Sequence, residues 1–133
     1  MKNSADEVID GLLAKKSNFF RGNDTKFKYE RIPFGIPSLD NLTGGGIHKK
    51  RMTLLYGPTN VGKSYLASQI CANAQKQGGR VGWIDTELSW DSDWVEKCGV
   101  DSKSIIVSQP THGEEAFGQI RDLMLAGIDV IVL

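Results

Sequence analysis

A glycine-rich stretch at residues 57–64 has the residue types and spacing that phosphate binding requires. It fits the pattern G-x-x-x-x-G-K-[ST] and consists of Gly57, Pro58, Thr59, Asn60, Val61, Gly62, Lys63 and Ser64. Glycines let the backbone curl so that its N–H groups point at phosphate oxygens, and a following helix adds the positive end of its dipole. Lys63 brings a cation to the β- and γ-phosphates, and the Ser64 hydroxyl is suited to ligate Mg²⁺. The stretch predicts binding of a nucleotide, and the alternative is a chance glycine-rich turn.

Two carboxylates at the end of the next apolar run, Asp85 and Glu87, bear on catalysis. Glu87 stands two residues beyond the run at 81–85. In a parallel sheet this position lies at the carboxyl end of a strand, where the phosphate loop also lies. A carboxylate there can orient and deprotonate the water that attacks a γ-phosphate. Glu87 is therefore the candidate base, against the alternative of a surface carboxylate, and Asp85 either supports Glu87 or closes the strand.

The elements that must position these residues follow from the apolar pattern. Apolar runs without polar alternation predict buried strands at 52–56, 81–85, 104–108 and 129–133. Helical spacing and capping signals predict helices at 64–77, 91–98 and 111–126, closed by glycines at 78–79, 99 and 127. The second helix begins with Asp91 as its cap, and the third begins with a capping box at Thr111 and Glu114. Strands separated by helices in this way indicate an α/β fold with a parallel sheet covered on both faces.

The first 30 residues have a different pattern. Ser4 and Glu7 form a capping box, and apolar residues at 8, 9, 12 and 13 follow on one helical face, which predicts a short helix near residues 5–16. Residues 17–30 are polar with aromatic interruptions, as in a connector. We therefore divide the chain into residues 1–30, a segment that docks on the body or on another subunit, and residues 31–133, the α/β part.

Composition and charge limit the classes of protein. The 133 residues are 40% hydrophobic and 24% charged, an ordinary globular balance. No apolar run approaches the roughly 20 residues that span a bilayer, so we expect no membrane partner. Cys71 and Cys98 fit no metal spacing and indicate reduced thiols in a cytoplasmic protein. Residues 1–63 carry 11 Lys and Arg against 6 Asp and Glu, and residues 64–133 carry 5 against 10. The basic first half either faces a phosphate backbone or forms a mixed, solvated surface.

Motifs on both sides of the loop resemble the opening of the ATPase core of RecA-like DNA recombinases, with bacterial and phage RecA proteins most similar. They are Phe34-Gly35-Ile36-Pro37-Ser38-Leu39-Asp40, Gly44-Gly45-Gly46-Ile47, the loop itself, and the stretches 83–87, 91–94, 99–101, 107–110, 113–116 and 129–132. The resemblance covers about residues 31–133 and is more specific than the loop alone. It implies a P-loop NTPase core whose N-terminal part is residues 31–133.

The resemblance also implies roles for individual residues. Glu87 matches the residue that activates water in the RecA family. Asp91 and Trp94 match the positions where RecA proteins contact adenine, by a hydrogen bond and by ring stacking. The family commonly has Tyr at the second position, so Trp94 can stack but offers no hydroxyl. The alternatives are that Asp91 is a helix N-cap and Trp94 a packing residue; Trp83 and Trp90 are predicted to pack.

A glycine triplet, a basic cluster and two histidines lead to further predictions. Gly44, Gly45 and Gly46 predict a tight turn into the first strand. The basic cluster at 49–51 either touches DNA or a neighbouring subunit or belongs to a solvated turn. His48 and His112 have no partners at metal-ligand spacing, and neither is expected to bind a metal.

For the intact protein the resemblance implies ATP and Mg²⁺ as cofactors, a homo-oligomeric filament on single-stranded DNA, and ATP-driven strand exchange in recombination and repair. The Asp that supports Mg²⁺ would be residue 134, and the DNA-binding loops and one further strand of the sheet would follow. We therefore expect a core that is incomplete at its C-terminus, poorly stable and weak in ATPase activity. Two alternatives remain: another RecA-superfamily ATPase, of helicase or signalling type, and a nucleotide-binding module without catalysis.

Overall fold

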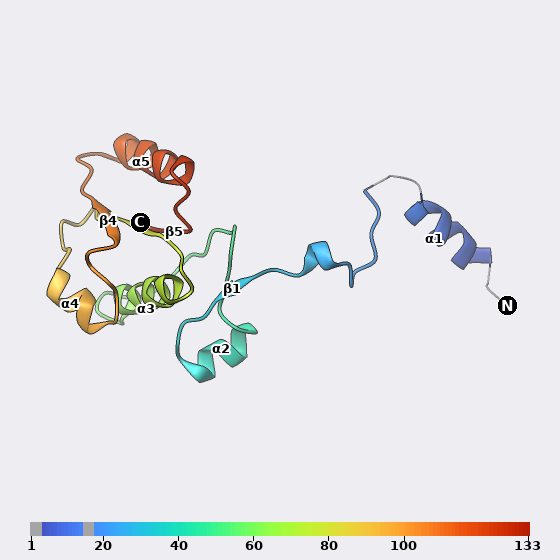
Figure 1. The fold of residues 1–133 in the computed structure, drawn as a ribbon, viewed down its shortest axis with the longest axis horizontal. Coiled ribbons are helices and arrows are strands. Elements are labelled where there is room, and N and C mark those ends of the chain that lie inside the picture. The colour runs from blue at the N-terminus through green and yellow to red at the C-terminus, as the bar shows by residue number, and fades with distance from the viewer. Residues whose placement is uncertain (1–3, 15–17) are drawn as a thin grey trace. The chain divides into compact units, whose positions relative to one another are not determined.

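The structure is a computed structural model that describes residues 4–14 and 18–133 (Figure 1). Its internal contacts divide the chain into two compact units, Met1–Glu30 and Arg31–Leu133.

Among its described residues, the first unit contains an α-helix and a 3₁₀ turn. Helix α1 spans Ser4–Ala14, so the predicted helix is present, although residues 15 and 16 of the predicted range lie outside the described residues. The described helix includes Ser4, whereas the sequence predicts Ser4 as the N-cap before the helix. The predicted connector holds a 3₁₀ turn at Thr25–Phe27, and the ion pair between Arg21 and Asp10 (3.0 Å) fastens it to α1.

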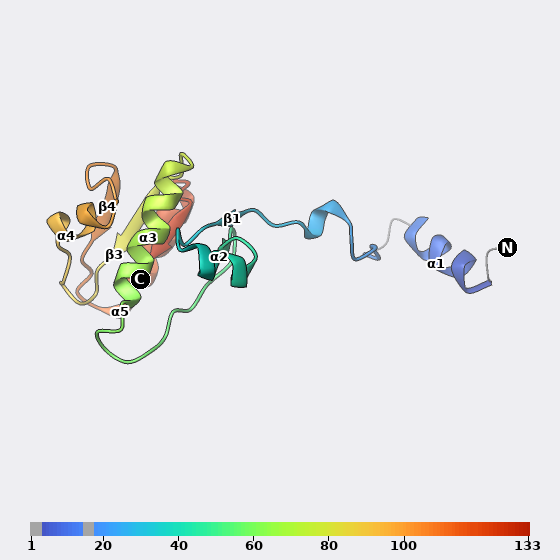
Figure 2. The same cartoon turned by 90° about the horizontal axis from the view of Figure 1, so that it is seen from below.

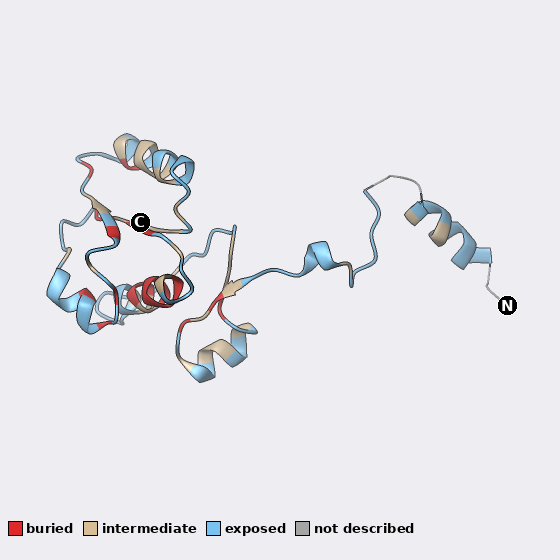
Figure 3. Cartoon of the chain, viewed as in Figure 1, coloured by how far each residue is buried: buried red, intermediate tan, exposed pale blue. Residues whose placement is uncertain are grey.

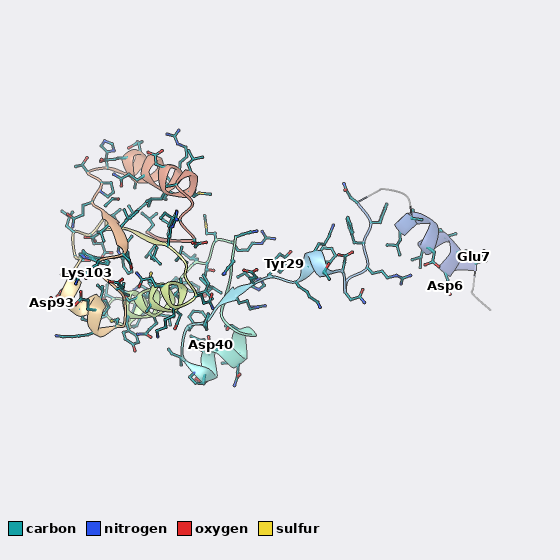
Figure 4. The ribbon with its side chains drawn as sticks, in the orientation of Figure 1. Asp6, Glu7, Tyr29, Asp40, Asp93 and Lys103 are labelled. Carbon is teal, nitrogen blue, oxygen red and sulfur yellow. The ribbon has the colours of Figure 1, made fainter. Side chains whose placement is uncertain are left out.

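The second unit begins with a small antiparallel sheet. Strand β1 (Arg31–Ile32) pairs with β2 (Ile47–His48), and helix α2 (Pro37–Thr43) lies between them in the chain. The carboxylate of Asp40, which Figure 4 labels on α2, accepts hydrogen bonds from the N–H groups of Phe34 (2.7 Å) and Gly35 (3.0 Å). These bonds close the loop that precedes α2.

A glycine turn links α2 to β2. Gly44 ends α2 in the left-handed conformation with φ of 68°, and Gly46 has φ of 112° with its Cα against the backbone of Ile32. Only glycine fits Gly46, because a Cβ there would overlap the Ile32 carbonyl group. The predicted tight turn is therefore present, but it leads into β2 of the small sheet and not into a strand of the parallel sheet.

Three parallel strands form the main sheet in the order β4-β3-β5. They are β3 (Val81–Ile84), β4 (Ile105–Ser108) and β5 (Val130–Val132), and Val81 pairs with Ile105 on one side and with Val130 on the other. The parallel sheet predicted from the apolar runs is confirmed for these three.

Helices cover both faces of this sheet, as predicted. Helix α3 (Lys63–Lys76) lies below the strands in Figure 1 and α5 (Gly113–Leu125) lies above them. The short helix α4 (Ser92–Lys97) follows β3 in the chain. The helix positions predicted from spacing and glycine stops are therefore confirmed to within a few residues.

The core is formed chiefly between α3 and the sheet. Cys71, Val81 and Ile84 are almost completely buried, and so are Ile70 and Ala74, which lie four residues apart on α3 (Figure 3). Burying a side chain such as Val or Ile contributes roughly 1.5–3 kcal/mol. This packing fixes the axis of α3 relative to β3 and so fixes where the first turn of α3 lies.

The strand predicted at residues 52–56 is wrong for this structure. These residues belong to neither sheet, and Met52, Leu54 and Tyr56 are 97%, 80% and 87% exposed; only Leu55 packs against the core. An apolar run becomes a strand only when its N–H and C=O groups find a neighbouring strand. In the described part of the chain no strand lies beside residues 52–56, so apolar composition alone did not produce the strand.

Two glycine substitutions test how this unit is built. Gly46→Ala should lower the free energy of unfolding by at least about 2 kcal/mol, because it combines a disfavoured positive φ with a clash against Ile32. Gly118→Ala is the matched control. Gly118 lies inside α5 with open space around its Cα, so alanine should stabilise the protein by about 0.5–1 kcal/mol. Urea unfolding followed by circular dichroism measures both, and equal effects of the two substitutions would contradict the account.

Candidate nucleotide-binding site

The residues of the predicted phosphate loop form a curled segment that leads directly into α3. Residues 58–62 turn and bend, and the helix begins at Lys63. Two positions need a positive φ: Asn60 at 62° and Gly62 at 92°. Glycine adopts this conformation without strain, and Asn tolerates it better than most residues. The residue types in the loop therefore suit the curl that the backbone makes.

The first turn of α3 presents unpaired backbone donors. Its N-cap residue, Gly62, provides no side-chain acceptor, and the first intrahelical bond runs from the N–H of Leu66 to the carbonyl of Gly62 (2.9 Å). The N–H groups at positions 63–65 consequently have no acceptor within the helix. With the helix dipole, they form a site that favours an anion.

Lys63 folds back over the loop. Its Nζ donates hydrogen bonds to the carbonyl oxygens of Gly57 (3.1 Å) and Pro58 (2.7 Å). The charged amine is therefore held against the first two residues of the loop and adds a positive charge there. The neighbouring Ser64 is exposed, and its carbonyl accepts a hydrogen bond from the Ser68 hydroxyl (2.9 Å).

Glu87 and the loop lie at the same edge of the main sheet. Glu87 is exposed in the turn that follows β3, at the carboxyl end of that strand. Helix α3 runs beside β3 and ends at the Gly78 and Gly79 reversal where β3 begins, so its first turn lies at the opposite end, which is the carboxyl edge (Figure 2). The structure thus brings the two predicted groups to one edge without a hydrogen bond between them.

Asp85 is a buried carboxylate that organises the turn carrying Glu87. It is 3% exposed, and its oxygens accept hydrogen bonds from the Ser89 N–H (3.1 Å) and hydroxyl (3.4 Å), the Trp90 N–H (3.0 Å) and the Gln109 side chain (2.9 Å). Burial raises the pKa of Asp85, but the bonds from Gln109, Ser89 and Trp90 outweigh it and lower the pKa below its ordinary value. Asp85 is thus held as the ionised carboxylate within the fold.

Asp91 caps α4, as the sequence predicted. Its carboxylate accepts a hydrogen bond from the N–H of Trp94 (3.0 Å), which satisfies one of the free donors of the first turn. The Trp94 side chain is 39% exposed, so one part of its ring remains on the surface. Gln69 on α3 donates to the carbonyl of Cys98 at the end of α4 (2.8 Å) and fastens α4 to the helix that carries the loop.

The other two tryptophans pack, as predicted. The rings of Trp83 and Trp90 meet at 5.5 Å with an interplanar angle of 63°, and both lie against the buried core. This edge-to-face contact joins the chain just before Asp85 to the chain just after Ser89.

His112 and the two cysteines have structural roles. His112 is the N-cap of α5, because its Nδ1 accepts the N–H of Glu115 (3.2 Å). The capping box predicted from Thr111 therefore lies one residue off, and Thr111 instead donates to the Glu115 carboxylate (2.7 and 2.9 Å). Cys71 and Cys98 are free and buried. Burial raises the pKa of the Cys71 thiol to about 12, and it also raises the pKa of the Cys98 thiol above its ordinary value. A thiol so held is a poor nucleophile.

Sequence reasoning missed the amide side chains that tie this edge of the sheet together. Gln109 and Gln69 join segments 24 and 29 residues apart. No pattern among neighbouring residues predicts such bonds, because the side chain of either glutamine could equally face solvent. Among the described residues no cluster of three or more His, Cys, Asp or Glu side chains is arranged to hold a metal ion, and no helix has the length and apolar character to cross a membrane.

The fold and the site define an α/β protein in which a glycine-rich loop opens a helix beside a parallel sheet. The chain belongs to the RecA N-terminal domain family, whose model matches residues 2–133. It is 40% identical over 128 residues to Protein RecA of Bifidobacterium longum, 39% over 127 residues to that of Clostridium botulinum, and 40% over 137 residues to that of Streptomyces coelicolor.

These matches cover 94%, 94% and 96% of this chain but 32%, 36% and 37% of the respective relatives. The chain therefore spans about a third of the length of the curated relatives it matches. The resemblance to the RecA family inferred from the sequence motifs is confirmed.

The buried Asp85 gives a pH-dependent prediction. Because its pKa is lowered on folding, the ionised carboxylate contributes stability above the ordinary value of 3.8, and this contribution is lost as the pH falls through the lower folded pKa. Asp85→Asn should cost about 1–3 kcal/mol near neutral pH, because hydrogen bonds to a buried charged carboxylate are replaced by weaker ones and one N–H loses its acceptor. In urea unfolding the difference between the two proteins should be constant from about pH 7 to 5 and shrink near about pH 3. A difference that widens in acid would contradict the account.

Proposed function

We propose that this chain binds ATP with Mg²⁺ through residues 57–64 and the first turn of α3. The observation that carries the proposal is the curled loop over a helix N-terminus that lacks a side-chain cap, with the Lys63 amine lying across it. Backbone donors, a helix dipole and a mobile cation are the groups that hold a triphosphate. The membership of the RecA N-terminal domain family supports the same conclusion.

Each group in the loop has a part in holding the nucleotide. The N–H groups at the start of α3 would hold phosphate oxygens, and Lys63 would exchange its bonds to the Gly57 and Pro58 carbonyls for the β- and γ-phosphates. Replacing a neutral carbonyl by a charged phosphate strengthens each bond of the amine. The exposed Ser64 hydroxyl would ligate Mg²⁺.

The same edge of the sheet supplies a base for hydrolysis. Bound ATP with Mg²⁺ supplies a phosphoryl group that can be transferred to water. Glu87 stands at the carboxyl end of β3, exposed to solvent, and its carboxylate would orient a water molecule and accept its proton. Asp91 and Trp94 would contact the adenine, Asp91 by a hydrogen bond and Trp94 by stacking, since part of the Trp94 ring is exposed.

For the protein as a whole we propose an ATP-dependent DNA recombinase that acts in homologous recombination and repair in the cytoplasm. It would form a homo-oligomeric filament on single-stranded DNA and promote strand exchange with ATP hydrolysis. The family and the curated relatives named Protein RecA support this proposal. The exposed Val8 and Ile9 of α1 are suited to pack on a neighbouring subunit.

A second candidate is a nucleotide-binding module without turnover. It is favoured by the exposed run at residues 52–56, because a loop whose preceding segment lacks strand partners is held mainly through α3. A loop held in this way can retain a phosphate, but it presents the γ-phosphate to Glu87 less rigidly. The two candidates differ in turnover and not in binding.

Substitution of the two central residues tests the proposal. Lys63→Ala should weaken binding of a fluorescent ATP analogue by at least about 10-fold, because a charge-assisted contact is lost. Lys76→Ala, at the far end of the same helix, is the matched control and should bind normally. Glu87→Gln should bind as the unmodified chain does and lose at least about 90% of any turnover.

The outcomes separate the candidates. Normal binding by Lys63→Ala would reject the loop as the nucleotide site. Binding without turnover in the unmodified chain would favour the module without catalysis. Turnover that is unchanged in Glu87→Gln would reject Glu87 as the base.

A further inference from the structure

The Asp85 carboxylate bridges the turn at residues 86–90, which directly follows Asp85 in the chain. Three of its four hydrogen bonds come from the far side of that turn, from Ser89 and Trp90, and the fourth comes from Gln109 at the end of the neighbouring strand β4. The backbone N–H of Asp85 also donates to the carbonyl of Ser108 (2.8 Å). The three residues enclosed by these bonds include Glu87, whose backbone is therefore held between the two ends of the turn.

The enclosed turn is strained, and packing does not explain why it persists. Leu88 has φ of 54°, a conformation that costs a residue with a branched side chain about 1–3 kcal/mol. The Leu88 side chain is 69% exposed, so burial of that side chain does not offset the strain. The turn is held on both sides of Leu88. Asp85 lies before it, and the N–H groups of Ser89 and Trp90 after it donate hydrogen bonds to the Asp85 carboxylate. Such strain survives only where the surroundings hold both ends of the turn.

We propose that Asp85 and Gln109 form a latch that holds the turn at 86–90 and thereby positions Glu87 at the carboxyl edge of the sheet. Asp85 is a positioning residue in this account, and Gln109 ties the turn to β4. The proposal rests on the proposed function only for the role of Glu87; the latch itself is a feature of the fold. Three of its four bonds are 2.9–3.1 Å long and its carboxylate is buried, so the turn is held without a ligand.

The expected effects of the two sides of the latch differ. Asp85→Asn places an amide where two pairs of donors converge, so at least one backbone N–H of Ser89 or Trp90 loses its acceptor. Gln109→Met removes one bond and leaves the carboxylate in place, which protects the proposal if Asp85→Asn does not fold. Gln119→Met is the matched control. Gln119 lies on α5 and accepts a hydrogen bond from the hydroxyl of Ser108 on β4 (2.6 Å), but it makes no hydrogen bond to the turn.

Hydrogen exchange tests the latch in the chain as it stands. The amides of Ser89 and Trp90 should exchange at least ~10-fold faster in Asp85→Asn and at least ~3-fold faster in Gln109→Met, with no change in Gln119→Met. Unchanged exchange in both latch variants would overturn the proposal. Equal acceleration in the Gln119→Met control would also overturn it, because the effect would then be general loosening of β4.

Single-turnover ATP hydrolysis with the protein in excess tests whether the latch acts through Glu87. Asp85→Asn should leave the affinity for a fluorescent ATP analogue within ~3-fold and lower the hydrolysis rate at least ~10-fold. In the Glu87→Gln background the same substitution should cause no further loss, because two residues that act through one group are not additive. Additive losses, or a loss of affinity in proportion to rate, would overturn the positioning role.

A failure of the proposed function is recognisable separately. If the unmodified chain binds ATP but does not hydrolyse it, hydrolysis by this chain is rejected, and the positioning role in it is rejected as well. The exchange result would still decide whether the latch holds the turn.

Discussion

The pairing of β3 with β4 on one side and β5 on the other is the constraint on which the candidate site depends. Parallel strands end at one edge, so the segments after β3 and β4 must emerge together. Helix α3 packs on this sheet through Cys71 and Ile70 and turns back at Gly78 into β3, which brings its first turn to that same edge. One backbone arrangement therefore gathers the loop, Glu87 and Gln109 from three separate stretches of sequence.

Two segments at this edge, the loop at residues 57–64 and the turn after β3, are held in different ways. The loop is held by its own backbone, through Asn60 and Gly62 in positive-φ conformations and the Lys63 amine on the loop carbonyls. The turn after β3 is held from outside, by the buried Asp85 and by Gln109 from the adjacent strand. A self-contained loop can adjust to a ligand, whereas a turn fixed from two sides presents its carboxylate in one place. In the proposed function, the loop would bind the nucleotide and this turn would carry the base, so the two tasks would fall to separately held segments.

Features set by neighbouring residues were predictable, and features set by distant ones were not. The runs at 81–85, 104–108 and 129–133 and the helices between them follow from apolar spacing and glycine stops, and Asp91 was found as a cap because capping involves residues three apart. The run at 52–56 has the same composition, but its fate depends on a strand beside it, and it stays exposed. The pattern predicted Thr111 as the cap of the third helix, whereas its neighbour His112 caps it, because both side chains can accept a hydrogen bond from the first turn. The latch joins residues 24 apart, beyond any local pattern.

The central claim is that the first turn of α3 and the loop before it form the nucleotide site. The most direct test is a titration of the isotope-labelled chain with ATP and Mg²⁺, followed by amide resonances. The account predicts saturable shifts that are largest at residues 60–65, smaller shifts around Glu87 and Trp94, and loss of all of them in Lys63→Ala. Saturable shifts centred elsewhere, for instance on the basic residues 49–51, or no shifts at millimolar ATP, would contradict it.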